Sequence, residues 1–172
     1  TAEIGSSGGS VSVSSKGLEM TGSGTIGGQQ DSFFFVHGQH FGDVVMKVKL
    51  QVSVTGGDDL YAGLMIRESS SPGSIYYAAG VNKGNQLQTS HRETSRGTVD
   101  VFTGQGVGES SVWLKITKAN NEFNAQSSMD GTNWKPIGDL ATVEFSNGAL
   151  RAGVFVTGGA TIIASDLSIS DF

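Results

Sequence analysis

The sequence predicts an all-β domain built from two packed antiparallel sheets, a β-sandwich, and three observations support this fold class. Short runs of alternating apolar and polar residues recur along the chain, as expected for half-buried strands. Gly, Ser, Asn and Asp fill nearly every gap between these runs, where they favour tight turns. No stretch long enough for a helix keeps the period of about 3.6 residues that an amphipathic helix needs.

The expected strands are residues 11–13, 17–21, 32–37, 43–54, 61–68, 75–81, 86–93, 112–118, 122–128, 135–140, 150–157 and 161–170. Turn sequences separate them, including residues 56–59, 71–73, 130–131 and 158–159. So many strands exceed what one flat open sheet holds, which leaves a sandwich or a closed barrel. We favour the sandwich.

The length of 172 residues fits one domain with a core of its own. Residues 1–10 carry little apolar content and are expected to be a linker or an edge segment, with a single β-sandwich domain over residues 11–172. The chain has no cysteine, so a disulfide framework, a thiolate metal site and a cysteine nucleophile are all excluded.

A net charge of −5 makes nucleic acid an unexpected partner, because binding to phosphate backbones needs clustered Lys and Arg. No apolar run is long enough to span a bilayer, so we expect no membrane span. Low charge with abundant Ser, Thr, Gly and Asn is typical of a secreted or cell-surface bacterial module, and we expect one that forms part of a larger multidomain protein.

Alternation within strands assigns side chains to faces, because residues i and i+2 lie on the same side of a strand. Leu64, Ile66, Leu114 and Ile116 belong to the core sides of their strands. If the strands concerned share one sheet, six side chains suited to a sugar lie together on its outer face: Arg67, Gln88, Arg92, Trp113, Lys115 and Gln126. Amides and guanidinium groups can bond vicinal hydroxyls, while an indole offers a flat apolar surface. The alternative is an ordinary solvated sheet face, which is polar in any antiparallel sheet.

An ordered series of motifs resembles the concanavalin A-like, laminin-G-like jelly-roll domains of bacterial secreted proteins. The series runs through A-G-L-M-I-R-E at 62–68, W-L-K-I at 113–116, S-M-D-G-T-N-W at 128–134 and G-V-F-V-T at 153–157. The resemblance implies a carbohydrate-binding module, commonly appended to a glycoside hydrolase or adhesin, with its ligand on the concave face of one sheet. Such domains often hold a structural calcium ion, for which Asp166, Glu3, Asp31 and Asp171 are candidates, the first being the strongest. The alternative is that these acids are ordinary turn or edge-strand residues.

The sequence does not predict an enzyme. Glycoside cleavage needs two carboxyl groups flanking the bond, whereas the glutamates are scattered and the one adjacent pair, Asp58 and Asp59, lies in a turn. The three histidines, His37, His40 and His91, show no zinc-binding spacing. The leading hypothesis is therefore a noncatalytic module that binds a polysaccharide or oligosaccharide, acidic or sulfated because its face carries two arginines and a lysine. The alternative is an adhesin or structural interaction module of a bacterial surface protein, and a hydrolase whose acids converge only in the fold is a third, weaker possibility.

Overall fold

The computed structural model describes residues 2–53 and 56–172, and all the regular elements in this part of the chain are β-strands. They are β1 (Ala2–Ile4), β2 (Gly9–Ser14), β3 (Gly17–Gly22), β4 (Phe33–Phe41), β5 (Val44–Val52), β6 (Tyr61–Arg67), β7 (Tyr76–Asn82), β8 (Gln86–Arg92), β9 (Asp100–Gly106), β10 (Ser111–Ala119), β11 (Glu122–Ser128), β12 (Lys135–Pro136), β13 (Ala141–Thr142), β14 (Ala149–Val156) and β15 (Ala160–Asp171).

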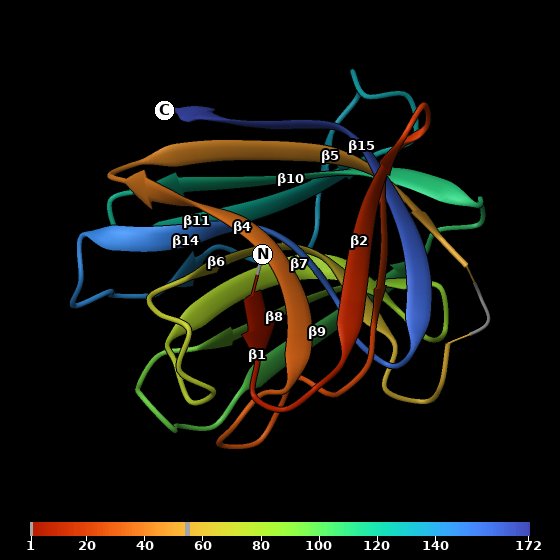
Figure 1. The fold of residues 1–172 in the computed structure, drawn as a ribbon. Helices are drawn as coiled ribbons and strands as arrows, with labels where there is room; N and C mark the ends of the chain where they lie inside the picture. Colours follow the sequence, from red (N-terminus) through yellow and green to blue (C-terminus); the bar gives the residue numbers. More distant parts are fainter. Residues whose placement is uncertain (1, 54–55) are drawn as a thin grey trace.

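The strands form two antiparallel sheets that lie one over the other (Figure 1). The first, called sheet A here, has the order β1-β4-β14-β6-β7-β8-β9. The second, sheet B, has the order β12-β11-β10-β5-β15-β3-β2, and β13 also pairs with β11. The chain crosses between the sheets several times, so strands that follow one another in sequence often belong to different layers. The predicted β-sandwich is confirmed.

The main core lies between the sheets and follows the predicted alternation. In β5, Val44, Met46, Val48 and Leu50 are all fully buried, while the side chains between them face outward. Each such buried aliphatic side chain contributes roughly 1.5–3 kcal/mol relative to an exposed one. The sandwich is thus stabilised mainly by apolar burial along the inner faces.

Sheet A is buried on its outer face as well. A second apolar cluster, which includes Phe33, Phe35, Tyr61, Met65 and Phe155, lies on that side with little or no exposure. All seven residues of β6 are buried as a result. The outer face of sheet A is therefore a second core covered by loops, and not an open sheet surface.

Some predicted boundaries differ from those observed. Strand β9 was not predicted, and the strand expected at 135–140 shortens to β12. Residues 2–4 form the edge strand β1, and β2 begins at Gly9. The expected strand 43–54 ends in Val54, which lies outside the described residues, and its observed part is β5.

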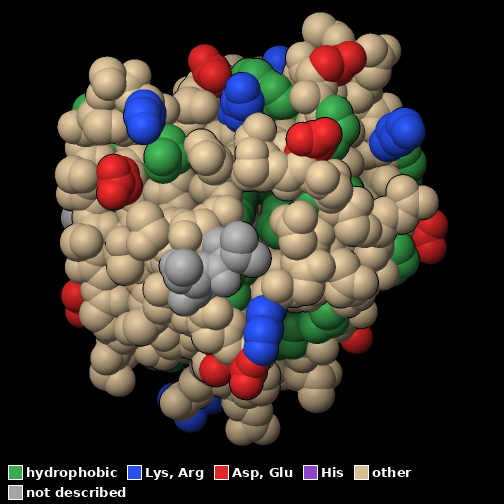
Figure 2. Space-filling view, turned by 90° about the vertical axis from the view of Figure 1, so that its right-hand side faces the viewer, with side chains coloured by type: hydrophobic (Ala, Val, Ile, Leu, Met, Phe, Trp, Pro, Cys, Tyr) green, Lys and Arg blue, Asp and Glu red, His purple; other side chains and the backbone are tan. Residues whose placement is uncertain are grey.

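Figure 2 shows one face of the molecule, on which Lys, Arg, Asp and Glu side chains are scattered among small groups of hydrophobic side chains. Across residues 2–53 and 56–172 there is no helix of the length and apolarity needed to cross a membrane.

Candidate functional site

The six side chains predicted to share one face are divided between the two sheets. Arg67 lies on β6, and Gln88 and Arg92 lie on β8, all in sheet A. Trp113 and Lys115 lie on β10 and Gln126 on β11, all in sheet B. The prediction of a single six-residue face is therefore wrong. Alternation correctly separates the two sides of each strand, but it contains no information on which strands pair.

Arg67 and Arg92 point to the outer side of sheet A, as predicted, yet both are fully buried there. Both donate to Oδ2 of Asp31, at 2.7 and 2.8 Å, and Arg92 also donates to Oδ1 at 2.8 Å. Burial lowers the pKa of Arg67. Burial also acts to lower the pKa of Arg92, but hydrogen bonds and the charge of Asp31 outweigh this effect and raise it. Both arginines hold the structure together beneath the surface and do not reach a ligand on it.

The remaining guanidinium contacts fasten three loops onto sheet A. Arg67 donates to the carbonyl oxygens of Ser69, Ser71 and Pro72, and Arg92 to those of Gly28, Ser74 and Gly97. The Tyr76 ring lies beneath both groups, 5.6 Å from Cζ of Arg67 and 5.2 Å from that of Arg92. These contacts explain why polar side chains that alternation places outward are nevertheless inaccessible.

Gln88, the third predicted residue of sheet A, lines a pocket. Its Oε1 accepts a hydrogen bond from Asn82 at 3.1 Å, and its pocket, about 360 Å³ in volume, also includes Ser90 and the loop residues Gly28 and Val99. The pocket is separated by the whole sandwich from the outer face of sheet B. Gln88 therefore cannot act together with Trp113, Lys115 and Gln126 on one ligand-binding face.

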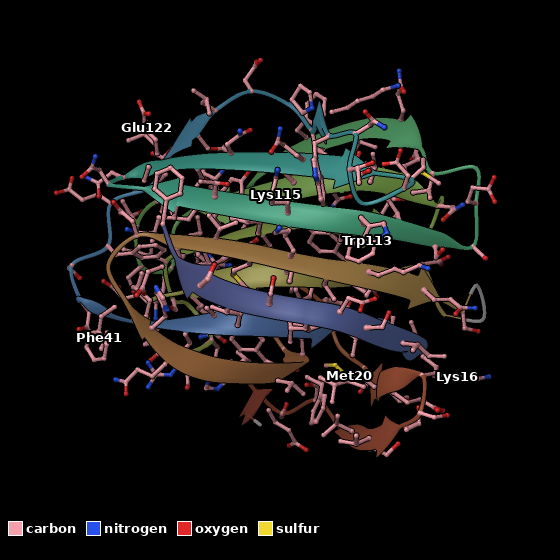
Figure 3. The ribbon with its side chains drawn as sticks, turned by 90° about the horizontal axis from the view of Figure 1, so that it is seen from above. Lys16, Met20, Phe41, Trp113, Lys115 and Glu122 are labelled. Atoms are coloured by element: carbon pink, nitrogen blue, oxygen red, sulfur yellow. The ribbon has the colours of Figure 1, made fainter. Side chains whose placement is uncertain are left out.

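The other three predicted residues do come together, on the outer face of sheet B. Lys115 lies directly opposite Gln126 on one side and Lys47 on the other. Trp113 lies two residues before Lys115 on β10 and directly opposite Lys49 of β5. Figure 3, which looks down onto this face, shows Trp113 and Lys115 side by side along the middle of the sheet.

Trp134 joins this group from the loop after β11. Nζ of Lys115 lies 4.2 Å from the centre of the Trp134 ring. The loop turns at Gly131, which has a positive φ of 77° and passes so close to Trp113 that an added Cβ would lie 3.0 Å from Cε2 of the indole. The structure thus places the Trp134 ring against an outward-facing lysine.

Asp130 holds this loop in shape. Its carboxylate accepts hydrogen bonds from the backbone N–H groups of Thr132 and Asn133, both at 2.8 Å, from Nδ2 of Asn133 and from the hydroxyl of Ser128. The bonds from Asn133, followed by those from Thr132 and Ser128, hold the pKa of Asp130 well below its usual range. The carboxylate is thus a fixed acceptor that orders the loop carrying Trp134.

We call the group formed by Lys47, Lys49, Trp113, Lys115, Gln126 and Trp134 the lysine–tryptophan face. In the described residues, the lysines that form ion pairs are Lys83 and Lys118, with Asp58 and Asp43. The three lysines of the face therefore carry uncompensated positive charge in a protein of net negative charge. Burial, followed by the nearby charge of Lys47, lowers the pKa of Lys115.

The structure also assembles a group that the sequence did not predict. His91 lies directly opposite Asp100 across the pair β8–β9, and Glu93 comes two residues after His91. Nε2 of His91 lies 3.2 Å from Oε1 of Glu93 and 3.5 Å from Oδ2 of Asp100. The β-branched residues Val99 and Val101 were the signal that could have identified β9, and with it this pairing.

The residues expected to hold calcium are dispersed. Glu3 lies on β1 in sheet A and Asp166 at an irregularity of β15 in sheet B, and both are exposed. Asp31 is committed to two arginines, and Asp171 lies 3.6 Å from His40. Within the described residues, neither Glu3 nor Asp166 belongs to a group of three potential ligands. The four acids do not lie together, and calcium binding at Asp166 or Glu3 stays a prediction.

No family model matches the chain, and no curated protein sequence is similar enough to match. Solved structures do match. A protein of unknown function from Saccharomyces cerevisiae superimposes with a TM-score of 0.77 at 19% identity, covering 99% of each chain. The carbohydrate-binding module CBM66 from Bacillus subtilis gives 0.65 at 15% identity, over 99% of this chain and 94% of the other. The GH43 protein BlXynB from Bacillus licheniformis gives 0.66 at 13% identity, over 90% of this chain and 33% of the other.

Identities this low establish a shared architecture and nothing further. The two antiparallel sheets and the superpositions over nearly the whole chain agree on the architecture. The chain has the fold of a concanavalin A-like jelly-roll domain.

Proposed function

We propose that this chain is a noncatalytic carbohydrate-binding module and that the lysine–tryptophan face binds an acidic polysaccharide. The observation that carries the proposal is the placement of two indoles and three unpaired lysines on one accessible sheet surface. An indole ring offers a flat apolar surface to the C–H face of a sugar, and ammonium groups attract carboxylate or sulfate substituents.

The geometry favours an extended polymer over a small sugar. Trp113 and Trp134 are half-buried and both lie near Lys115 on an open sheet, so the ligand would lie along a surface rather than enter a cavity. Gln126, opposite Lys115, supplies an amide that can both donate to and accept from hydroxyl groups.

The proposal includes where the protein acts and the larger protein to which the module belongs. A secreted bacterial protein in which the module is appended to a glycoside hydrolase is consistent with the match to one third of a GH43 chain and to most of a CBM66 chain. An adhesin or structural interaction module would use the same fold, and a glycan-binding experiment separates the two.

The test is affinity electrophoresis through gels containing a polyuronate, a sulfated polysaccharide or a neutral glucan. The acidic polymers should retard the protein more than the glucan does, and Trp113→Ala and Trp134→Ala should each reduce the retardation. Phe41→Ala is the matched control, because Phe41 is an aromatic residue that is 65% exposed and lies away from the face (Figure 3).

Retardation by none of the polymers, or equal retardation of the three variants, would overturn the proposal. The noncatalytic part is checked by incubating the protein with the retained polymer. New reducing ends would show that the protein is an enzyme, and the acids beside His91 would then be the first residues to replace.

A further inference from the structure

We propose that His91, Glu93 and Asp100 form a binding site for a transition-metal dication, with Zn²⁺ as the ion that fits best. The ligand atoms of these three side chains all lie within 4.8 Å of one another. In the described part of the chain, this is the one place where three His, Asp or Glu ligand atoms gather so closely. The site is separate from the lysine–tryptophan face and does not depend on the function proposed for it.

The backbone fixes this arrangement. His91 and Asp100 are cross-strand partners in the antiparallel pair β8–β9, so their side chains lie on the same side of sheet A. Glu93, two residues beyond His91, continues that side just after β8 ends. The paired strands hold His91 and Asp100 in place, and Glu93 follows directly after β8. The backbone therefore brings three donor side chains to one point.

The three side chains open onto a pocket of about 450 Å³ at the edge of the sandwich, between β8–β9 and residues 139–142 of the facing layer. Asp139 adds a further carboxylate to the lining. The pocket gives an ion a path from solvent and leaves room for water to complete its coordination.

A second observation, independent of the acids, points to a polar ligand in this pocket. Tyr77 lines it and is 1% exposed, and its hydroxyl has no hydrogen-bond partner among the described residues. The ring is held in place by stacking on Phe123 at 4.8 Å and on His91 at 6.2 Å. A buried hydroxyl without a partner costs free energy, so such groups normally have a polar neighbour. A hydrated ion in the pocket would provide one.

The donor set selects the class of metal. One imidazole and two carboxylates balance the charge of a dication, and imidazole nitrogen suits Zn²⁺ and similar transition metals better than Ca²⁺ or Mg²⁺, which prefer oxygen alone. The competing arrangement without metal is a protonated His91 that forms ion pairs with both acids at the observed distances. A titration with metal distinguishes the two.

The experiment uses protein treated with EDTA and dialysed, to which ZnCl₂ or CaCl₂ is added while the thermal unfolding midpoint is measured. Zn²⁺ at about 100 times its Kd should raise the midpoint by roughly 5–10 °C. His91→Ala should abolish the shift, and the nearly isosteric Asp100→Asn should weaken Zn²⁺ binding by at least about tenfold. Asp100 has a side chain that is 71% exposed, so its replacement should not disturb folding.

His40→Ala is the matched control, because His40 also lies near an acid, Asp171, but without a third ligand. This variant should keep the full Zn²⁺ shift, and His91→Ala should keep its retardation by polysaccharide. The proposal is overturned by the absence of a shift at millimolar Zn²⁺, by a shift that persists in His91→Ala, by equal losses in His91→Ala and His40→Ala, or by stabilisation with Ca²⁺ alone.

Discussion

The ammonium group of Lys115 lies 4.2 Å from the centre of the Trp134 ring, so a strand of sheet B and the loop after β11 meet at a cation–π contact. The contact places a positive charge and an aromatic surface at the same point of an open sheet. Such pairs contribute about 0.5–1 kcal/mol at exposed sites. Because Lys115 lies on the sheet and Trp134 on the loop, this contact also helps to hold the loop against the lysine–tryptophan face.

Replacing Lys115 by Gln should weaken binding of an acidic polysaccharide roughly fivefold, equivalent to about 1 kcal/mol. The variant removes a charge from a group of three lysines and keeps a polar side chain. Isothermal titration calorimetry at several salt concentrations measures the effect, and the difference between the two proteins should shrink as salt screens the charge. Lys16→Gln is the control, because Lys16 is exposed in the β2–β3 turn, away from the face (Figure 3). Equal losses in both variants would contradict a role for this particular face.

Asp130 should make the stability of the protein depend on pH in the acid range. Hydrogen bonds from Asn133, Thr132 and Ser128 hold its pKa in the folded state below the value of about 3.9 expected when unfolded. The ionised Asp130 carboxylate therefore contributes its full stabilisation at pH values above its pKa in the unfolded state. This contribution is lost as the pH falls through its pKa in the folded state. The unfolding midpoint of Asp130→Asn should lie below that of the wild type at neutral pH, and the gap should narrow in strong acid.

The comparison for this prediction is Glu122→Gln, which removes an exposed acid from the first position of β11, the strand that precedes the Asp130 loop. Its midpoint should follow the wild type at every pH. Carbon-13 NMR of the carboxyl groups gives a direct check, because the Asp130 signal should titrate well below the value of about 3.9 expected for an unfolded aspartate. A normal titration of Asp130 would contradict the assigned hydrogen bonds.

Alternation along single strands predicted much of this molecule. It placed Leu114 and Ile116 in the core and Trp113 and Lys115 outside, and the structure agrees for all four. These assignments depend only on the geometry of a strand, in which neighbouring side chains face opposite ways. Trp113 and Lys115 share one surface for this reason, and Gln126 joins them because β11 pairs with β10.

The errors arose where contacts between distant parts of the chain decide the outcome. Arg67 meets Asp31 across 36 residues and Arg92 meets it across 61, and the carboxylate arrives on a loop that has no periodic pattern. A side chain known to face outward can still be covered by such a loop. Likewise, Asp100 became the partner of His91 only through the pairing of β9, a strand with too little apolar alternation to be predicted from that pattern.

Asp31→Asn should destabilise the fold by about 3–5 kcal/mol, because it leaves two fully buried guanidinium groups without a counter-charge. The amide would also turn N–H groups toward arginine donors that need acceptors. Urea unfolding monitored by tryptophan fluorescence measures the change. Asp43→Asn is the control: Asp43 pairs with Lys118 but its side chain is 35% exposed, so about 1 kcal/mol is expected. Similar losses in the two variants would show that the buried cluster is not the stronger constraint.

The loop that carries Asp31 should tolerate alanine at Gly28 and reject it at Gly24. Both glycines have positive φ, 61° and 98°, so each substitution carries a backbone cost of about 1–2 kcal/mol. Gly28 has no atom within 4 Å of an added Cβ, whereas at Gly24 the Cβ would lie 1.9 Å from the carbonyl oxygen of Ser32. That oxygen belongs to the backbone of Ser32, which forms a β-bridge with Thr25 and is next to Asp31 in the chain.

Gly24→Ala should therefore cost at least about 3 kcal/mol in urea unfolding, clearly more than Gly28→Ala. Because the steric conflict is next to Asp31, limited proteolysis should also cut residues 23–32 faster in Gly24→Ala. The pair of variants separates the cost of positive φ, which both share, from the collision, which only one has. Equal stability would mean that the loop adjusts without strain, and that the arginine cluster does not depend on its close packing.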